Sequence, residues 1–534
     1  MDPDRVPRAS AGRVLLPLLV LVLVAVGLRV AVITWRAQND PLFHHPLNDA
    51  ALYLDWAQHV VDGETFGPEG APYLMAPLYP WFVAGLLTLG GGSPWAITVA
   101  QSLLGVLVIV GLFEIGRRLW DLRTGLAAGG LALLAAPPLW FEGWFLSSTL
   151  DLFLLVSTVL LTVLALRPGS ARRWFLAVGL VVGLAALNRP QHLLIAAGLI
   201  AFFARCARGD AGRRWKVPAL TLLGVVVVIA PVTVRNLVQS GEFVPISSNG
   251  GVNFYLGNHF GADGRFGMPS DWPPRIEDQA RFARSRASEI QGERLDWSGT
   301  SSYWFGRGLS ELSDQAGPLL LEKLRLLFAW REQENNFDAT WVHRHLGPGR
   351  VLLPSIGVLW ILALPALVVF VRRRDGSVTP LVIVLVATVA VCLLFWVGTR
   401  NRLPLLIPLA LFGGVTLAHL SWLKRPLGIG VAALAFVLVV WPTADREGPA
   451  FLTDVARVYA QRGEPAEARR VFEEALAIDP QHLPALNGVA LTYMEQGRTE
   501  QAIRMLEDIV RRYPGFELGR QNLERMRRVQ RGEH

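Results

Sequence analysis

The sequence is poor in cysteine and in charge, and both shortages limit what the chain can be. Only two cysteines occur among 534 residues, Cys206 beside an arginine-rich stretch and Cys392 inside an apolar run. Two separated thiols provide neither a disulfide framework nor the ligand spacing of a zinc site. Charged residues make up 18% of the chain and hydrophobic residues 52%, which excludes a single water-soluble domain.

The positive net charge does not indicate a nucleic-acid-binding protein. The formal net charge is +8, but the arginines stand in short clusters between apolar runs, as in the loops of a multi-pass membrane protein. We therefore expect membrane lipid as a partner and no nucleic acid.

Eleven apolar runs approach or reach the length that crosses a bilayer. They cover approximately residues 14–33, 94–115, 124–139, 148–166, 174–187, 190–204, 216–234, 351–371, 378–397, 403–419 and 427–441. The first run contains Arg29 and lacks an A-x-A cleavage pattern, so we expect an uncleaved span and not a signal peptide. The sequence predicts an all-α, polytopic helical membrane protein.

The arginine clusters predict the orientation in a plasma or inner membrane. With a cytoplasmic N-terminus, the clusters at 117–123, 167–173, 205–216, 372–374 and 424–425 all fall on the cytoplasmic side, as the positive-inside rule requires. The loops 34–93 and 235–350 and the C-terminus are then extracytoplasmic. The apolar segment 77–87 is short, and we expect a surface-lying or half-inserted helix there.

An internal repeat of 34 residues follows the last apolar run. Its positions are Leu452, Ala456, Tyr459, Gly463 and Pro480, which recur as Leu486, Ala490, Tyr493, Gly497 and Pro514. This is the tetratricopeptide pattern, and a helix over 517–529 would cap it. We predict a membrane domain over 1–442 and a repeat domain over 443–534. The repeats either dock a protein partner or act as a folding cap without a ligand.

An acid stands at the start of the first polar segment, 46–57. Leu52, Tyr53 and Trp56 fall on one stripe of the expected helix, which suits the headgroup region of a membrane. Asp49 is then either an ordinary helix-start residue, favoured there by the helix dipole, or a general base at the membrane surface.

Attack of a hydroxyl on a sugar carbon that carries a phosphate also needs cations for the leaving phosphate. Arg400 and Arg402, at the outer mouth of a span, are candidates, and Arg189 is a weaker one. The alternatives are interfacial anchoring for the first two and stabilisation of a hinge for Arg189. Glu142 and Asp151 are candidates for a second acid, because acids at membrane depth are costly and seldom lack a function.

The order of several short motifs resembles the GT-C superfamily of membrane glycosyltransferases. The motifs are Asn48-Asp-Ala, Ala76-Pro-Leu-Tyr-Pro80, Gly116-Arg-Arg-Leu119, Leu150-Asp151 and Arg400-Asn-Arg-Leu-Pro404. The chain looks most like bacterial members related to the protein O-mannosyltransferases of family 39 and to the aminoarabinose transferases of lipid A, over about residues 14–440. The resemblance implies a sugar donor on a polyprenyl phosphate in the outer leaflet.

The resemblance also implies roles for particular acids. In that family an Asp of the first outer loop acts at the sugar-transfer centre, and the matching position is Asp49. Asp151 matches an acid of the aminoarabinose-transferase-like members, and Glu142 matches an acid of other bacterial members. This chain departs from the family where Met75-Ala76 stands in place of a Lys that often precedes Pro-Leu.

We therefore expect an inverting transferase with Asp49 as general base and the outer arginines and Tyr53 as donor ligands. The acceptor is a hydroxyl of a protein, a lipid or a glycan. No cofactor is indicated, and His343 and His345 lack acids at metal-ligand spacing. A transporter would carry ionisable residues in mid-span and two matching halves, and neither is evident. A non-catalytic scaffold that displays the repeats would need no acid on the outer face.

Overall fold

The computed structural model describes residues 11–64, 69–207, 215–269, 272–273, 276–333, 338–353, 355–420, 426–441 and 448–531. These residues form helices and loops, with an isolated β-bridge between Ala135 and Leu353. The chain divides into two compact units. The first comprises Met1–Trp35, Asn48–Asn335 and Leu346–Thr443, and the second comprises Arg36–Leu47, Asn336–His345 and Ala444–His534.

The helices up to residue 440 are α1 (Ala11–Asn39), α2 (Asp49–Val61), α3 (Leu78–Leu89), α4 (Trp95–Leu119), α5 (Leu122–Leu134), α6 (Ala136–Glu142), α7 (Ser148–Ala165), α8 (Arg173–Asn188), α9 (Leu193–Cys206), α10 (Lys216–Ser240), α11 (Gly250–Leu256), α12 (Ile276–Gln291), α13 (Trp297–Phe328), α14 (Ala339–Arg344), α15 (Trp360–Arg373), α16 (Thr379–Leu394), α17 (Thr399–Arg402), α18 (Leu406–Ala418) and α19 (Pro426–Val440). Short 3₁₀ turns join some of them.

All eleven predicted spans contain apolar helix. Among the described residues, seven stretches are long and apolar enough to cross a membrane: Val14–Asn39, Trp95–Leu119, Ser148–Ala165, Lys216–Ser240, Ile356–Arg373, Gly376–Leu394 and Thr399–Ala418. Four shorter apolar stretches, Leu122–Leu134, Arg173–Asn188, Pro190–Cys206 and Gly428–Val440, account for the other predicted spans. A fifth, α3, is the segment expected at the membrane surface.

One predicted span, 124–139, is divided in the structure. The α-helix ends at Leu134, and α6 begins at Ala136 after an extended Ala135. The two prolines at 137 and 138 explain the break, because proline has no N–H for the helical hydrogen bond and clashes with the preceding turn. The backbone of Leu353 forms hydrogen bonds with the groups on either side of the break. Its N–H donates to Leu134 O at 2.8 Å, and its O accepts from Ala136 N at 2.9 Å.

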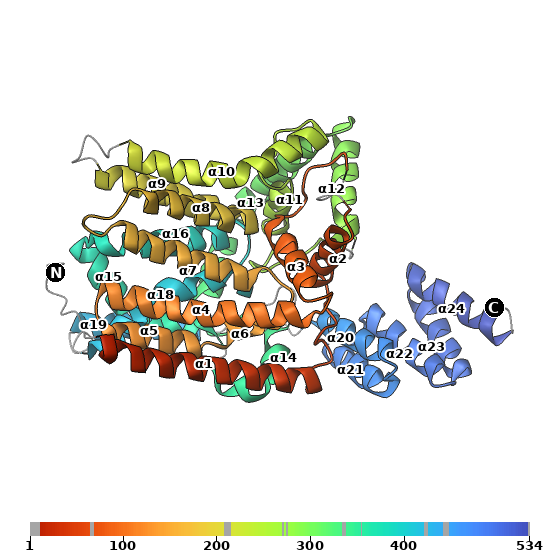
Figure 1. Ribbon diagram of the computed structural model, residues 1–534. Coiled ribbons are helices and arrows are strands. Elements are labelled where there is room, and N and C mark those ends of the chain that lie inside the picture. Colours follow the sequence, from red (N-terminus) through yellow and green to blue (C-terminus); the bar gives the residue numbers. More distant parts are fainter. Residues whose placement is uncertain are drawn as a thin grey trace. The chain divides into compact units, whose positions relative to one another are not determined.

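Close packing of the first unit depends on small residues where helices cross. In Figure 1 the helices α4, α5, α7, α8 and α10 run side by side. A Cβ on Gly179 of α8 would lie 2.1 Å from Thr221 O of α10, and a Cβ on Gly224 of α10 would lie 2.6 Å from Leu176 O. The two backbones therefore approach more closely than any side chain would allow, as is common between membrane helices.

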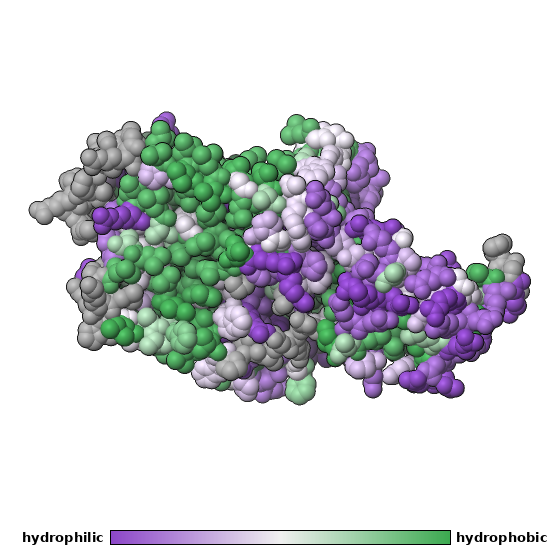
Figure 2. Space-filling view, turned by 90° about the horizontal axis from the view of Figure 1, so that it is seen from below, coloured by the Kyte–Doolittle hydropathy of each residue, from purple (hydrophilic) through white to green (hydrophobic). Residues whose placement is uncertain are grey.

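The surface of the first unit is apolar where a bilayer would cover it. Figure 2 shows a broad hydrophobic area across the helices of this unit. Exposed large apolar side chains occur on α1 (Leu15, Leu16, Leu19, Leu23), α4 (Val99, Leu103, Leu107) and α10 (Leu222, Leu223, Val226, Val227). An exposed apolar surface of this extent fits lipid and not water. The first unit is thus a multi-pass membrane unit.

Successive long helices alternate in direction, so their connections fall at two opposite ends of the bundle. The connections α4–α5, α7–α8 and α15–α16 carry the arginine clusters at 117–123, 167–173 and 372–374. At the other end lie the start of α2, the start of α7, the end of α8 and the turn before α18. Figure 1 shows α2, α3, α11 and α12 gathered at that end.

The second unit includes α14 and contains the repeats, whose helices are α20 (Pro449–Gln461), α21 (Pro465–Ile478), α22 (Leu483–Glu495), α23 (Thr499–Arg512) and α24 (Glu517–Gln530). The predicted capping helix is α24, whose Leu523 and Met526 are buried in one core with Ala502 and Leu506 of α23. Ala490 and Ala502 are completely buried, as the tetratricopeptide pattern requires for close helix pairs.

The close contact of α21 with α22 leads to a stability prediction. A Cβ on Gly488 would lie 2.3 Å from the ring of Phe472, and this ring is buried. We expect Gly488→Ala to destabilise the repeat unit by about 1–3 kcal/mol, because an overpacked core must shift. The measurement is protease resistance of this unit against temperature in the intact protein. The control is Gly515→Ala, where nothing lies within 4 Å of the added Cβ; equal melting of both variants would contradict the packing.

Candidate active site

Asp49 forms an ion pair with Arg400 at the polar end of the membrane bundle. Arg400 Nη1 donates a hydrogen bond to Asp49 Oδ2 at 2.5 Å. The two residues are 351 positions apart in the sequence. Asp49 is the first residue of α2, and Asn48 before it has a positive φ of 51°, a conformation that Asn tolerates better than most residues. The Asp49 side chain is 23% exposed and that of Arg400 is 8% exposed.

The segment between α1 and α3, which carries α2, is fastened to the end of α10. Asn236 Oδ1 accepts from Tyr73 N at 3.0 Å, and Tyr73 O accepts from Ser248 N at 2.9 Å. The guanidinium of Arg235 lies 4.3 Å from the centre of the Tyr73 ring. Burial raises the pKa of Tyr73 to about 12, so the phenol stays neutral. These contacts hold the segment in place, and none of them involves Asp49 at the start of α2.

Arg189 holds the backbone that presents Arg400. Its Nη1 donates to Arg400 O at 2.9 Å, and its Nη2 donates to Asn401 Oδ1 at 2.5 Å. Arg400 and Asn401 belong to α17, a single turn before the α18 helix. Arg189 follows the last residue of α8 and has an extended backbone, which is the conformation expected before Pro190. The predicted hinge between α8 and α9 thus places Arg189 against the backbone of α17.

Asp151 lies beside Arg189 and is itself paired. Its carboxylate is 2% exposed. It lies 2.7 Å from His192 Nε2, accepts a hydrogen bond from Asn188 Nδ2 at 3.3 Å, and lies 3.7 Å from Arg189 Nη1. Each of the two arginines therefore lies beside an acid, Arg189 beside Asp151 and Arg400 beside Asp49, which is how buried charges are tolerated. We call Asp49, Asp151, Arg189, His192 and Arg400 the acid–arginine cluster.

Tyr53 stands one turn after Asp49 on the same face of α2, as residues four apart do. Its ring packs edge-on against Tyr79 with centroids 5.1 Å apart. Tyr79 in turn donates to Gln101 Oε1 at 3.0 Å. Tyr53 is buried, and its phenol makes a side-chain hydrogen bond with Arg400.

Glu142 and Arg402 are predicted site residues that the structure does not bring into the cluster. Glu142 is 2% exposed and accepts a hydrogen bond from Arg29 Nη2 of α1 at 2.5 Å. Arg402 is fully buried; it donates to Ala329 O at 2.8 Å and to Arg331 O at 3.1 Å. Glu332 lies 3.6 Å from its Nη1. Both side chains are committed to neighbours that hold helices and loops together.

His192 of the cluster, and Asn188 and Asn401 that hydrogen-bond to the cluster, are residues that sequence reasoning did not select. His192 is buried at the start of the apolar helix α9. An ionisable residue beside an apolar run is costly to bury, and this feature of the sequence could have identified it. The two asparagines resemble ordinary turn residues, and only their long-range contacts distinguish them.

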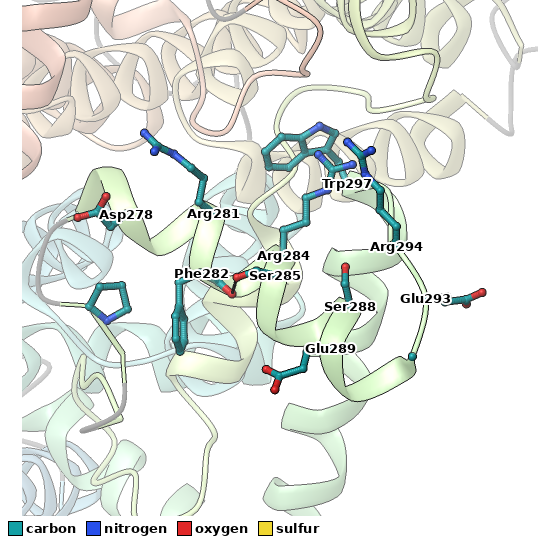
Figure 3. A pocket seen from close by; sticks show the side chains of 12 residues that line it. Asp278, Arg281, Phe282, Arg284, Ser285, Ser288, Glu289, Glu293, Arg294 and Trp297 are labelled. Atoms are coloured by element: carbon teal, nitrogen blue, oxygen red, sulfur yellow. Dashed lines mark hydrogen bonds between the residues drawn. The ribbon is translucent and has the colours of Figure 1, made fainter.

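A separate open groove lies on α12 and the start of α13. Its volume is about 1120 Å³, and its lining includes three arginines, Arg281, Arg284 and Arg294, as well as Asp278, Glu289 and Glu293. Figure 3 shows Arg284 and Arg294 extending towards Trp297, while Glu289 and Glu293 point away from it. Because the lining carries equal numbers of acids and bases, the groove has no net charge that would select an anion. None of the predicted site residues lines it.

Two segments of the chain match known families. Residues 74–234 match the family described as dolichyl-phosphate-mannose-protein mannosyltransferase, and residues 459–520 match the tetratricopeptide repeat. The predicted resemblance to membrane glycosyltransferases and the predicted repeats are thereby confirmed. The first match includes Asp151 and Arg189 but neither Asp49 nor Arg400.

Solved structures of two kinds are similar to the chain over most of its length. ArnT from Cupriavidus metallidurans bound to undecaprenyl phosphate is 16% identical, with 94% of this chain and 81% of that chain covered and a TM-score of 0.44. The Archaeoglobus fulgidus oligosaccharyltransferase complex with Zn and sulfate is 14% identical, with 83% and 55% covered and a TM-score of 0.43. This chain spans about half the length of that archaeal protein.

A curated relative matches a smaller part of the chain. The tetratricopeptide repeat and J domain-containing co-chaperone of Fusarium oxysporum is 32% identical over 105 residues, which are 19% of this chain and 20% of the relative. The match is therefore to one fifth of the co-chaperone.

The contacts of Arg402 predict a structural role for that residue. Arg402→Met leaves Glu332 as an uncompensated buried charge, and we expect a loss of about 3–5 kcal/mol in stability. The double variant Arg402→Met/Glu332→Gln should recover part of this loss, because it removes the stranded charge. The measurement is thermal unfolding of the detergent-solubilised protein. An unchanged melting temperature of Arg402→Met, together with weaker binding of a polyprenyl phosphate, would instead support the donor-binding role suggested by the sequence.

Proposed function

We propose that the chain is a membrane glycosyltransferase that moves a sugar from a polyprenyl-phosphate donor to an acceptor hydroxyl. The observation that carries the proposal is the pairing of Asp49 with Arg400 within the acid–arginine cluster, at the end of the bundle opposite the arginine-rich connections. A carboxylate and a guanidinium in one place are the two groups that this reaction needs. The match of residues 74–234 to a family whose donor is a dolichyl-phosphate sugar supports the donor class.

The proposed step is a single displacement at the anomeric carbon. The acceptor oxygen forms the new bond to that carbon while the bond from carbon to phosphate oxygen breaks, and its electron pair stays on the leaving phosphate. The acceptor proton passes to Asp49, which acts as general base. Inversion at the anomeric carbon follows from one displacement.

Arg400 is the proposed principal ligand of the leaving phosphate. Its guanidinium is buried and forked, which suits two oxygens of a phosphate. Among the described residues, Arg400 Nε is buried and has no hydrogen-bond partner, and a buried donor without a partner calls for a ligand. Arg189 adds a second positive charge next to it and fixes its backbone. Arg402 is left out of this proposal because its guanidinium is already committed to carbonyl groups and Glu332.

Asp151 and His192 have a supporting place in the proposal. Asp151 neutralises the positive charge of Arg189, which reduces the repulsion between Arg189 and Arg400. The identity of the acceptor is open among a protein, a lipid and a glycan. The tetratricopeptide unit gives a protein partner a surface on which to dock, which is the proposed role of that unit.

The proposed orientation places the cluster outside the plasma or inner membrane. It follows from the arginine-rich connections, which the positive-inside rule assigns to the cytoplasm. The N-terminus is then cytoplasmic, and the repeats are extracytoplasmic.

The exposed native Cys206 tests the orientation directly. Cys206 ends α9 at the arginine-rich end of the bundle, and Cys392 is buried. In intact cells a membrane-impermeant maleimide should leave Cys206 unlabelled and label it only after permeabilisation. A Cys206→Ser/Asp55→Cys variant should show the reverse, because Asp55 is exposed on α2. Labelling of Cys206 from outside would invert the proposed topology.

Substitution of the base tests the reaction. We expect Asp49→Asn to slow transfer by about 10²–10⁴-fold, the usual contribution of a positioned general base, in protein that gel filtration shows to be folded. The measurement is release of polyprenyl phosphate from a panel of polyprenyl-phosphate sugars in the presence of cell-envelope acceptors. The matched control is Asp55→Asn, which removes the same charge from the exposed face of the same helix. Equal release by the Asp49→Asn variant and the wild type would favour a non-catalytic scaffold or a transporter.

A further inference from the structure

Arg400 is the partner of Asp49 in the structure and, in the proposed reaction, the ligand of the donor phosphate. We infer that the two anions exchange on this arginine: the donor phosphate takes Arg400 and thereby releases Asp49 to act as the base. The inference rests on the proposed function and adds an order to it, since the donor must bind before the acceptor proton can be taken.

The guanidinium has one N–H group firmly engaged by the carboxylate, and its other N–H groups are weakly bound or unoccupied. Arg400 Nη1 is engaged by Asp49 Oδ2 at 2.5 Å, and Nη2 donates to the hydroxyl of Ser147 at a longer 3.3 Å. The Nε edge has no partner among the described residues. A phosphate that binds the fork with two oxygens needs two neighbouring N–H groups. It therefore displaces the weaker serine contact first, and its negative charge then competes with the carboxylate for the positive charge of the guanidinium.

The arginine is the fixed partner of the pair. Its carbonyl accepts from Arg189 Nη1 at 2.9 Å, and the preceding Thr399 donates through its N–H and its hydroxyl to Gln333 O at 3.1 and 2.7 Å. All four residues of α17 are buried. Movement of Arg400 away from the bundle would break these contacts.

Asp49 is the partner that can move. It is the first residue of α2, its side chain is 23% exposed, and the Asn48 side chain makes no capping hydrogen bond to the helix. A rotation about its side-chain bonds would swing the carboxylate off the guanidinium without breaking a described helix contact. In its new position it would be attracted by the positive N-terminus of α2.

The exchange has a chemical consequence. While Asp49 is paired, its Oδ2 accepts the hydrogen bond of Arg400 Nη1 and is not available to an acceptor hydroxyl. A phosphate carries at least one negative charge of its own, so its arrival replaces the charge that the carboxylate supplied. The carboxylate of Asp49 is thus available as a base only when the donor is bound. A hydroxyl that arrives without a donor is not deprotonated.

The test measures affinity for an unsubstituted polyprenyl monophosphate in nanodiscs, by titration with wild-type protein and variants. Asp49→Asn should bind the lipid about fivefold more tightly or better, because the fraction of Arg400 held by the carboxylate becomes available. The Asp55→Asn control should bind as the wild type does. Arg400→Gln should weaken binding.

A double variant separates the exchange from a general gain in positive charge. In the Arg400→Gln background, the further change Asp49→Asn should leave affinity unchanged, since the two anions then have no arginine to share. An equal gain with and without Arg400 would overturn the exchange and indicate only the lost negative charge. Unchanged or weaker binding by Asp49→Asn alone would also overturn it. If the wild-type protein binds no polyprenyl phosphate at all, the proposed function fails and the exchange fails with it.

Discussion

The ion pair between the carboxylate of Asp49 and the guanidinium of Arg400 is the interaction on which the rest of this site depends. Removal of either partner would leave a charge in a poorly hydrated place, which costs several kcal/mol or more. The pair joins the start of α2 to α17, two parts of the chain 351 residues apart. The centre is therefore complete only when these two parts are packed together.

Around this pair the structure balances charges one by one. Asp151 stands against Arg189, Arg29 against Glu142, and Glu332 against Arg402. Most of these groups would be prohibitive alone at membrane depth. The distinction between a structural pair and a reactive one lies in the accessibility of the acid. The Asp49 side chain is 23% exposed, whereas those of Glu142 and Glu332 are 2% and 0% exposed.

Much of the fold could be predicted because its signals are local. The apolar runs and the 34-residue repeat depend on composition or period, and both correspond to helix in the structure. Three of the arginine clusters fall in connections between helices. The sequence predicted one span over 124–139 and not the break at Ala135. Pro137 and Pro138 are a local signal of this break, but the run of apolar residues continues through them. The domain boundary near residue 442 stays a prediction, since the compact units also group two short segments of the earlier chain with the repeats.

The site could be predicted only in part, because partners are chosen in three dimensions. Asp49, Arg189 and Arg400 were selected, and the structure places them together. Arg402 lies two residues from Arg400 and carries the same charge, yet the turn of α17 directs its guanidinium to the carbonyls of Ala329 and Arg331. No sequence pattern separates two such neighbours.

The most direct measurement is a cryo-electron microscopy structure of the protein with a polyprenyl phosphate added. The account predicts phosphate density within about 3 Å of the Arg400 guanidinium, with the Asp49 carboxylate turned away from it and facing the open end of the bundle. Phosphate density elsewhere, for example beside Arg281 and Arg294 on α12, with the Asp49–Arg400 pair intact, would contradict it.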